Sequence, residues 1–364
     1  MSTPTLTPDT RTPISPTTGS ATAETWTTGP AQMTGTVPAA APAQADTALL
    51  PASGSRTPQT AQAAPVPAPQ AYHRLVRAIP RERYWWRPLV ALAVFGAGYV
   101  VMFLVMALPG IVLSEAVPEL AFSESMADAR NPMDIVMGLG SIAIMIPAVL
   151  IAVRVAYGRL GIVHSVRGRF RWGMLGRAAV VVLPFYVLLN IGLTLLIARS
   201  TLEIPPLTWP VVAAMVIILL IVPLQSAGEE YAFRALPLQV FGTWLRSPLW
   251  GILLPVPLFM VGHGYHWVGQ IDIALFAIAM GALAWKTGGL ELPILLHVAN
   301  NWTIFMLAPF MKEELVQGAV PPVALLFSTV PMLLITAGLW WWHSRREGLG
   351  LWEPARGTLT QPSA

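Results

Sequence analysis

Residues 209–227 read WPVVAAMVIILLIVPLQSA, and the segment GEEYAFR follows directly at residues 228–234. The first segment holds no charged residue and is about as long as the roughly 20 apolar residues that cross a bilayer. In hydrocarbon every backbone N–H and C=O must be paired within the segment, and an apolar run without strand alternation achieves this only as a helix. The sequence therefore predicts a transmembrane helix that is followed at once by two glutamates.

Seven further apolar segments of the chain have the same character. With 209–227, the expected spans are 89–113, 135–155, 175–197, 250–264, 271–290, 293–308 and 323–342, of which 250–264 and 293–308 are short. The chain is 55% apolar and 11% charged, with a mean hydropathy of +0.61, whereas soluble domains carry about 25% charged residues. We therefore predict an all-α, polytopic membrane protein of about eight transmembrane helices.

The ends of the chain differ from this apolar centre. Residues 1–70 are rich in Thr, Pro and Ala and hold too little large apolar surface to offset the entropy of ordering, so we expect a disordered tail. The tail lacks the basic and apolar regions of a signal peptide, so the first span is expected to be an uncleaved anchor. The remaining parts are expected to be a basic juxtamembrane segment with three helices at 71–200, a catalytic core at 201–310, and the last helix with a cytoplasmic tail at 311–364.

Arginines alternate between the connecting segments. The segment before the first span reads HRLVRAIPRERYWWR. The stretch from Arg154 to Arg177, which joins the second and third spans and includes their ends, holds six arginines, whereas the loop at 114–131 holds four acids and only Arg130. The positive-inside rule then places both termini in the cytoplasm of a multi-pass protein of the plasma membrane. We interpret these charges as topology signals in contact with the lipid bilayer and expect no nucleic-acid partner.

Ionisable residues within the apolar half cluster in three short segments, and each costs roughly 2.5–3.5 kcal/mol at a bilayer centre, so they are candidates for function. Glu230 and Arg234 stand at i and i+4 in the order that favours an ion pair. Glu229 points elsewhere and has no partner on its own helix, which suits a general base for water. The alternative is that both glutamates only mark the end of the helix.

Two further segments supply histidines. His263 alone would more often be a hydrogen-bonded core residue, but His297 and Asn301, also at i and i+4, present an imidazole and an amide on one helix face. Such a pair can polarise a carbonyl and stabilise an oxyanion, although helix–helix hydrogen bonding is the alternative. We expect His266 to lie in a loop, and the basic flanks that hold His73, His164 and His343 carry no such signal.

The order of these segments carries a resemblance. Glu229-Glu230 with Phe233-Arg234, then Phe259 with His263, then the run from Gly281 through Lys-Thr-Gly to His297 and Asn301 resemble the motifs of the CAAX-protease and bacteriocin-processing (CPBP, formerly Abi) intramembrane proteases. The resemblance covers roughly residues 210–305. Ala235 departs from it, since a glycine commonly follows the family's arginine, and we expect slightly altered helix packing there.

The resemblance implies a peptidase that hydrolyses an amide bond within or at the edge of the membrane. It implies that Glu229 and His263 activate water, that His297 and Asn301 bind the scissile carbonyl or its oxyanion, and that Glu230 and Arg234 hold the site in place. The implied substrate is a hydrophobic or membrane-tethered peptide, and the eukaryotic branch of the family cuts prenylated Cys-a-a-X peptides.

The sequence leaves the metal and the function class open. Glu229, His263 and His297 match the two-histidine, one-carboxylate set of a zinc hydrolase, but there is no His-Glu-x-x-His. The family has been described both as metalloproteases and as metal-free glutamate enzymes. The absence of cysteine excludes a cysteine nucleophile and a thiolate metal site. One alternative to a peptidase is a non-catalytic scaffold or immunity-type protein. Another is a transporter, which predicts an internal repeat with matching polar segments in both halves of the chain, whereas only the second half is polar.

Overall fold

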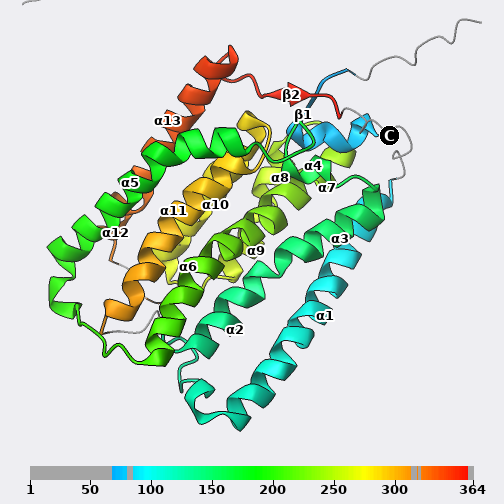
Figure 1. Ribbon diagram of the computed structural model, residues 1–364. Coiled ribbons are helices and arrows are strands. Elements are labelled where there is room, and N and C mark those ends of the chain that lie inside the picture. The colour runs from blue at the N-terminus through cyan, green and yellow to red at the C-terminus, as the bar shows by residue number, and fades with distance from the viewer. Residues whose placement is uncertain (1–67, 80–84, 313–317, 319–320, 360–364) are drawn as a thin grey trace, which may run out of the picture. The chain divides into compact units, whose positions relative to one another are not determined.

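The computed structural model describes residues 68–79, 85–312, 318 and 321–359, so nearly all of the expected tail at 1–70 lies outside the described residues. Within these ranges seven helical stretches are long and apolar enough to cross a membrane (Figure 1). They are α1 (Arg87–Ala116), α2 (Pro132–Ala143) with α3 (Met145–Tyr157), α5 (Trp172–Ile197), α6 (Trp209–Glu230) with the π-helical segment η4 (Tyr231–Ala235) and α7 (Leu236–Trp244), α10 (Trp267–Thr287), α11 (Glu291–Leu307), and α12 (Ala324–Phe327) with α13 (Thr329–Glu347). The predicted all-α polytopic fold is confirmed.

Shorter elements connect these helices. They are η1 (Tyr72–Ala78), η2 (Pro118–Leu120), α4 (Gly161–His164), η3 (Arg199–Thr201), α8 (Leu249–Leu253), α9 (Val256–Val261) and η5 (Ala308–Phe310), with the two-residue strands β1 (Gln70–Ala71) and β2 (Arg356–Gly357).

The expected span at 250–264 is a pair of short helices and not one long helix. α8 ends at Leu253, and α9 begins at Val256 with Pro257 in its first turn. Proline has no N–H to continue the previous helix but fits the first turn of a new one. Because α9 ends at Val261, His263 lies in the loop that leads to α10.

The helix that opens at Trp209 does not end at residue 227. The helical path continues through Glu229 and Glu230 and the π-helical segment Tyr231–Ala235 into α7. Pro237 offers no N–H to the carbonyl of Phe233, which removes an α-helical hydrogen bond from this turn. The two glutamates therefore lie inside a helical stretch, and π segments of this kind often occur at functional sites.

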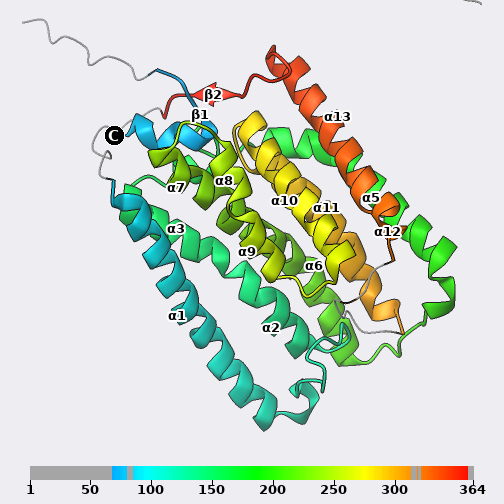
Figure 2. The same ribbon diagram turned by 180° about the vertical axis from the view of Figure 1, so that it is seen from behind.

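α6, α10 and α11 form the middle of the described bundle (Figures 1 and 2). α1, α2 and α3 lie on one side of them, and α5, α12 and α13 on the other, in both views. α11 contacts both α5 and α6, and α2 packs along α6. At one point α2 and α6 are so close that a Cβ on Gly228 would lie 3.3 Å from the carbonyl carbon of Ile142 and nearer still to its oxygen.

Both described ends of the chain meet at one end of the bundle. β1 pairs antiparallel with β2, and η1 packs against α7. The hydroxyl of Tyr72 donates to the carbonyl of Val163 at 2.6 Å, and the amide of Gln239 donates to the carbonyl of Tyr72 at 2.7 Å. The ammonium of Lys286 donates to carbonyls of the segment that follows α13. These contacts form an end cap, which we define as residues 70–79 and 349–359.

Candidate active site

His297 connects the two glutamates. Its Nδ1 lies 2.8 Å from Oε1 of Glu230, and its Nε2 lies 3.1 Å from Oε2 of Glu229. All three side chains are buried, since their relative exposures are 3%, 0% and 6% for His297, Glu230 and Glu229. α11 thus supplies the partner that Glu229 lacks on its own helix.

Arg234 forms the predicted ion pair with Glu230, with Nη1 3.3 Å from Oε1. The pair forms across the π segment, and both side chains are inaccessible to solvent. The guanidinium lies over the ring of Phe259 at 4.3 Å and near that of Phe276 at 5.7 Å. Aromatic faces stabilise a desolvated cation by about 2 kcal/mol or more, so the arginine is held from two sides.

His263 is fixed by the carbonyl of Phe259, which lies 2.9 Å from its Nδ1. A carbonyl oxygen only accepts, so Nδ1 donates its proton. In the neutral ring the lone pair then resides on Nε2. The side chain is half-buried, and its ring packs against Phe259 with 4.7 Å between centroids.

A cavity of about 510 Å³ brings four of the six predicted site residues together. Glu229, His263, His297 and Asn301 line it, whereas Glu230 and Arg234 lie behind its wall. The rest of the lining is mostly apolar. Its members include Leu139 and Ile142 of α2, Ile273 and Phe276 of α10, Ile304 and Phe305 of α11, and Leu325 of α12.

Sequence reasoning missed several polar residues of this cavity. The amide of Asn301 donates to the side-chain oxygen of Gln225 at 3.2 Å, and Asn300 donates to Asn301 at 3.1 Å. Asp272 accepts a hydrogen bond from Thr329. Gln225 stands four residues before Glu229, so helical spacing could have placed it on the same face, whereas no local signal identified Asp272.

The part of the chain that contains this site matches a known protein family. Residues 208–303 match the family described as type II CAAX prenyl endopeptidase Rce1-like. This segment belongs to that family. The predicted CPBP resemblance is thereby confirmed, and the Rce1-like segment contains every residue of the predicted site, from Glu229 to Asn301.

A curated relative gives a weaker comparison. An uncharacterized protein of Bacillus subtilis (strain 168), YyaK, is 29% identical over 156 residues, which cover 38% of this chain and 50% of the relative. The chain thus spans about half the length of that relative. No solved structure gives a significant match.

The Rce1-like segment does not present the metal site that the sequence left open. Among the described residues no three His, Cys, Asp or Glu side chains are arranged to hold a metal ion. Both ring nitrogens of His297 face carboxylate oxygens, so neither offers a lone pair to a cation. Glu229, His263 and His297 as arranged do not fit zinc.

The other histidines lie away from the cavity. His266 is exposed and precedes α10, as expected for a loop residue. His73, which belongs to the end cap, donates from Nε2 to the carbonyl of Arg246. Nδ1 of His164 lies 2.7 Å from the hydroxyl oxygen of Tyr231. His343 is buried on α13.

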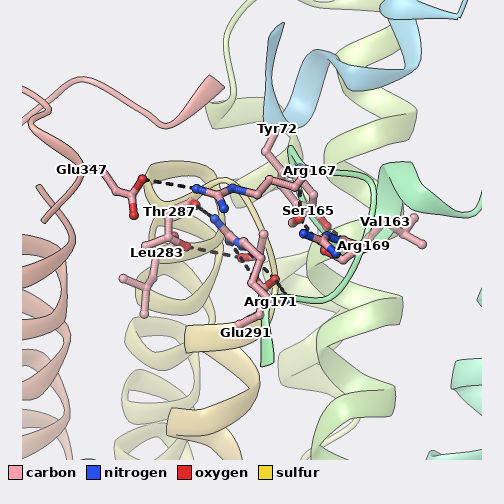
Figure 3. A network of polar contacts seen from close by, with 11 residues as sticks. Tyr72, Val163, Ser165, Arg167, Arg169, Arg171, Leu283, Thr287, Glu291 and Glu347 are labelled. Carbon is pink, nitrogen blue, oxygen red and sulfur yellow. Dashed lines mark hydrogen bonds and ion pairs between the residues drawn. The ribbon is translucent and has the colours of Figure 1, made fainter. Parts of the chain in front are cut away.

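A buried ion pair holds the start of α11, the helix that carries His297 (Figure 3). The guanidinium of Arg171 binds both carboxylate oxygens of Glu291, at 2.9 and 2.7 Å, and its backbone N–H donates to the same group at 2.8 Å. Arg171 also donates to the carbonyl of Thr287. His297 stands six residues further along α11, about 9 Å at the rise of an α-helix, so this pair fixes the helix close to the site.

Proposed function

We propose that this protein is an intramembrane endopeptidase that hydrolyses peptide bonds of hydrophobic or membrane-associated peptides, using water activated by Glu229 and His263. One observation carries the proposal: a single cavity of about 510 Å³ is lined by Glu229, His263, His297 and Asn301, which come from two helices and a loop. The Rce1-like match over the same residues supports a peptidase.

Two side chains that line the cavity have acceptor atoms that can take a proton from water. Glu229 offers a carboxylate, and His263 offers the Nε2 lone pair that its bond to Phe259 leaves available. A water held between them transfers a proton to one of these groups as its oxygen attacks the carbonyl carbon. General-base assistance of this kind contributes about 10²–10⁴-fold to rate.

We assign stabilisation of the oxyanion to the side-chain amide of Asn301 on α11. One N–H of Asn301 is taken by Gln225, and its second N–H is available to the oxygen of the tetrahedral intermediate. Loss of one such donor costs about 10²–10³-fold in rate. The proton taken from water then passes to the leaving nitrogen, the C–N bond breaks, and a carboxylate and an amine leave.

The charges at and behind the cavity wall balance when His297 is an imidazolium. Glu229 and Glu230 then supply two negative charges, and Arg234 and His297 supply two positive ones. A buried set of zero net charge avoids the cost of an unpaired ion. Glu230 and Arg234 are thus positioning residues for His297.

The proposed substrate class follows from the apolar lining. Hydrophobic side chains of a bound peptide would pack against the apolar residues of α2, α10 and α11 that line the cavity. Prenylated C-terminal peptides, the kind named in the family's description, belong to this substrate class. Metal-free hydrolysis is the mechanism we propose for it.

We further propose that the end cap faces the cytoplasm and that the protein resides in the plasma membrane. The end cap joins both described chain ends. At the same end of the bundle, Arg154 and Arg159 lie at the end of α3, and Arg345 and Arg346 lie in the last turn of α13. Glu115 and Glu119 lie at the opposite end, where α1 ends. This is the charge bias of a cytoplasmic side. Fusions of a fluorescent protein and of alkaline phosphatase to the C-terminus report the side directly, and phosphatase activity would contradict the assignment.

Cleavage of hydrophobic peptides by the detergent-purified protein tests the function. Glu229→Gln keeps the size of the side chain but removes the base, so cleavage should fall by at least roughly 10²-fold. Glu119→Gln, an exposed glutamate outside the cavity, is the matched control. Undiminished cleavage in Glu229→Gln would exclude the mechanism, and loss of cleavage on exhaustive chelation would exclude the metal-free form of it.

A further inference from the structure

A second cavity, of about 390 Å³, lies apart from the active-site cavity. Its walls come from the loop before α5, the first turns of α5 and the last turn of α13. The residues that line it are Arg167, Arg169, Phe170, Arg171, Trp172, Gly173, Met174, Arg177, Arg346 and Glu347. Five of these are arginines and one is an acid.

The charges of this arginine cavity are only partly compensated. Figure 3 shows the two ion pairs, Arg167 with Glu347 and Arg171 with Glu291. Arg171 is neutralised by Glu291, and Arg167 reaches Glu347 at 3.7 Å while its side chain remains 60% exposed. Among the described residues, neither Arg169 nor Arg177 has an ion-pair partner. The cavity thus gathers about three uncompensated positive charges, and such a concentration attracts an anion.

The first turn of α5 adds to this field. α5 is 26 residues long, and Trp172, Gly173 and Met174 of its first turn line the cavity. The N-terminus of a helix carries about half a positive charge and unpaired N–H groups, which favour phosphate. Guanidinium groups bind phosphate oxygens in pairs. Both features select a phosphate-bearing anion.

The surroundings place the cavity at the edge of the lipid phase. Trp172 is 72% exposed, and Val180 and Val181, two turns along α5, are 73% and 63% exposed. On α13 the guanidinium of Arg345 lies 5.8 Å from the ring centre of Trp341. Exposed Trp next to Arg, followed by exposed aliphatic side chains, is the pattern of a membrane–water interface.

We propose that the arginine cavity binds the phosphate headgroup of an anionic phospholipid. Basic cavities between transmembrane helices at the headgroup level bind acidic lipids. The acyl chains would lie along the exposed apolar face of α5, and the phosphate would lie between Arg169, Arg177 and the first turn of that helix. A free phosphate shares the headgroup chemistry but gains nothing from the apolar face.

The test measures binding of phosphatidylglycerol, of phosphatidylcholine with the same chains, and of inorganic phosphate to the full chain in detergent, by native mass spectrometry and thermal unfolding. Removal of two arginines in Arg169→Gln/Arg177→Gln should weaken phosphatidylglycerol binding roughly 30-fold, or about 2 kcal/mol. Both side chains are exposed, so the variant should fold. Arg154→Gln/Arg159→Gln removes the same charge from the same end of the bundle outside the cavity and should bind as the wild type does.

Each outcome decides the proposal. Binding of phosphatidylglycerol that is lost only in Arg169→Gln/Arg177→Gln supports it. An equal loss in both double variants would show diffuse attraction and overturn the site. Phosphatidylcholine binding as tight as that of phosphatidylglycerol would remove the role of charge, and inorganic phosphate binding as tightly as phosphatidylglycerol would assign the site to a soluble anion.

Discussion

Replacement of Gly228 by alanine is expected to displace Glu229, the proposed general base, without unfolding the protein. An added Cβ would lie closer than 3.0 Å to the carbonyl oxygen of Ile142, whereas ordinary contact begins at 3.4 Å. α2 and α6 must therefore separate by more than 0.4 Å, because the opposing atom is backbone and cannot rotate away. Overpacking of this kind costs about 1–3 kcal/mol.

The activity should respond more strongly than the stability. Glu229 is the next residue, and a misplacement of about 1 Å in an active site can lower the rate by about 10²-fold. We expect peptide cleavage by Gly228→Ala to fall roughly 10- to 100-fold while the thermal transition remains cooperative. The assay compares cleavage rates and unfolding midpoints of the same preparations.

The control is Gly138→Ala on α2, where an added Cβ meets no atom within 4 Å. That change should leave cleavage unaffected and stabilise the helix by up to about 1 kcal/mol, the difference in helix propensity. If Gly228→Ala cleaved at the rate of Gly138→Ala, the inference that close helix approach positions Glu229 would be wrong.

Three further predictions concern buried charge. Glu291→Gln leaves the guanidinium of Arg171 without its carboxylate and should destabilise the protein by about 3–5 kcal/mol in thermal unfolding, whereas Glu119→Gln should not. Arg234→Lys keeps the charge but not the planar group over Phe259, so we expect a loss of about 2 kcal/mol and slower cleavage; an unchanged midpoint would contradict the stacking role. Burial lowers the pKa of His73 and of His164, although the hydrogen bond to Arg246 and the charge of Glu291, respectively, oppose the shift. The unfolded chain then binds more protons, so the unfolding midpoint should fall as pH drops below about 6.5, and His73→Gln/His164→Gln should flatten that dependence.

The sequence predicted those features that local patterns determine. Apolar runs identified the long helices, and the spacing of Glu230 and Arg234 predicted their ion pair correctly. The prediction that Glu229 has no partner on its own helix also agrees with the structure, but its contact with His297 crosses between helices, and spacing along one helix cannot reveal which face of another will meet it.

Other features were predicted in part or not at all, for related physical reasons. Pro255 and Pro257 predict a break in the span at 250–264, and the two short helices at 249–261 confirm it. The π segment after Glu230 has no such signal, because it depends on how tertiary packing accommodates the turn before Pro237. In the sequence Arg171 is one of several arginines that indicate topology. Its pairing with Glu291, 120 residues away, depends on how the loop before α5 folds back onto α11.

The strand pair between Gln70–Ala71 and Arg356–Gly357 brings the two ends of the described chain next to each other. Proteins whose ends are adjacent usually tolerate circular permutation. In a variant that comprises residues 68–359, a short linker across this pair would allow new termini to be opened in the exposed connection between η3 and α6, near Ile204, which is 87% exposed. The permuted chain would begin just before the Rce1-like segment and end with α5 and η3. The order in which the helices enter the membrane would change while the contacts of the folded bundle stay the same.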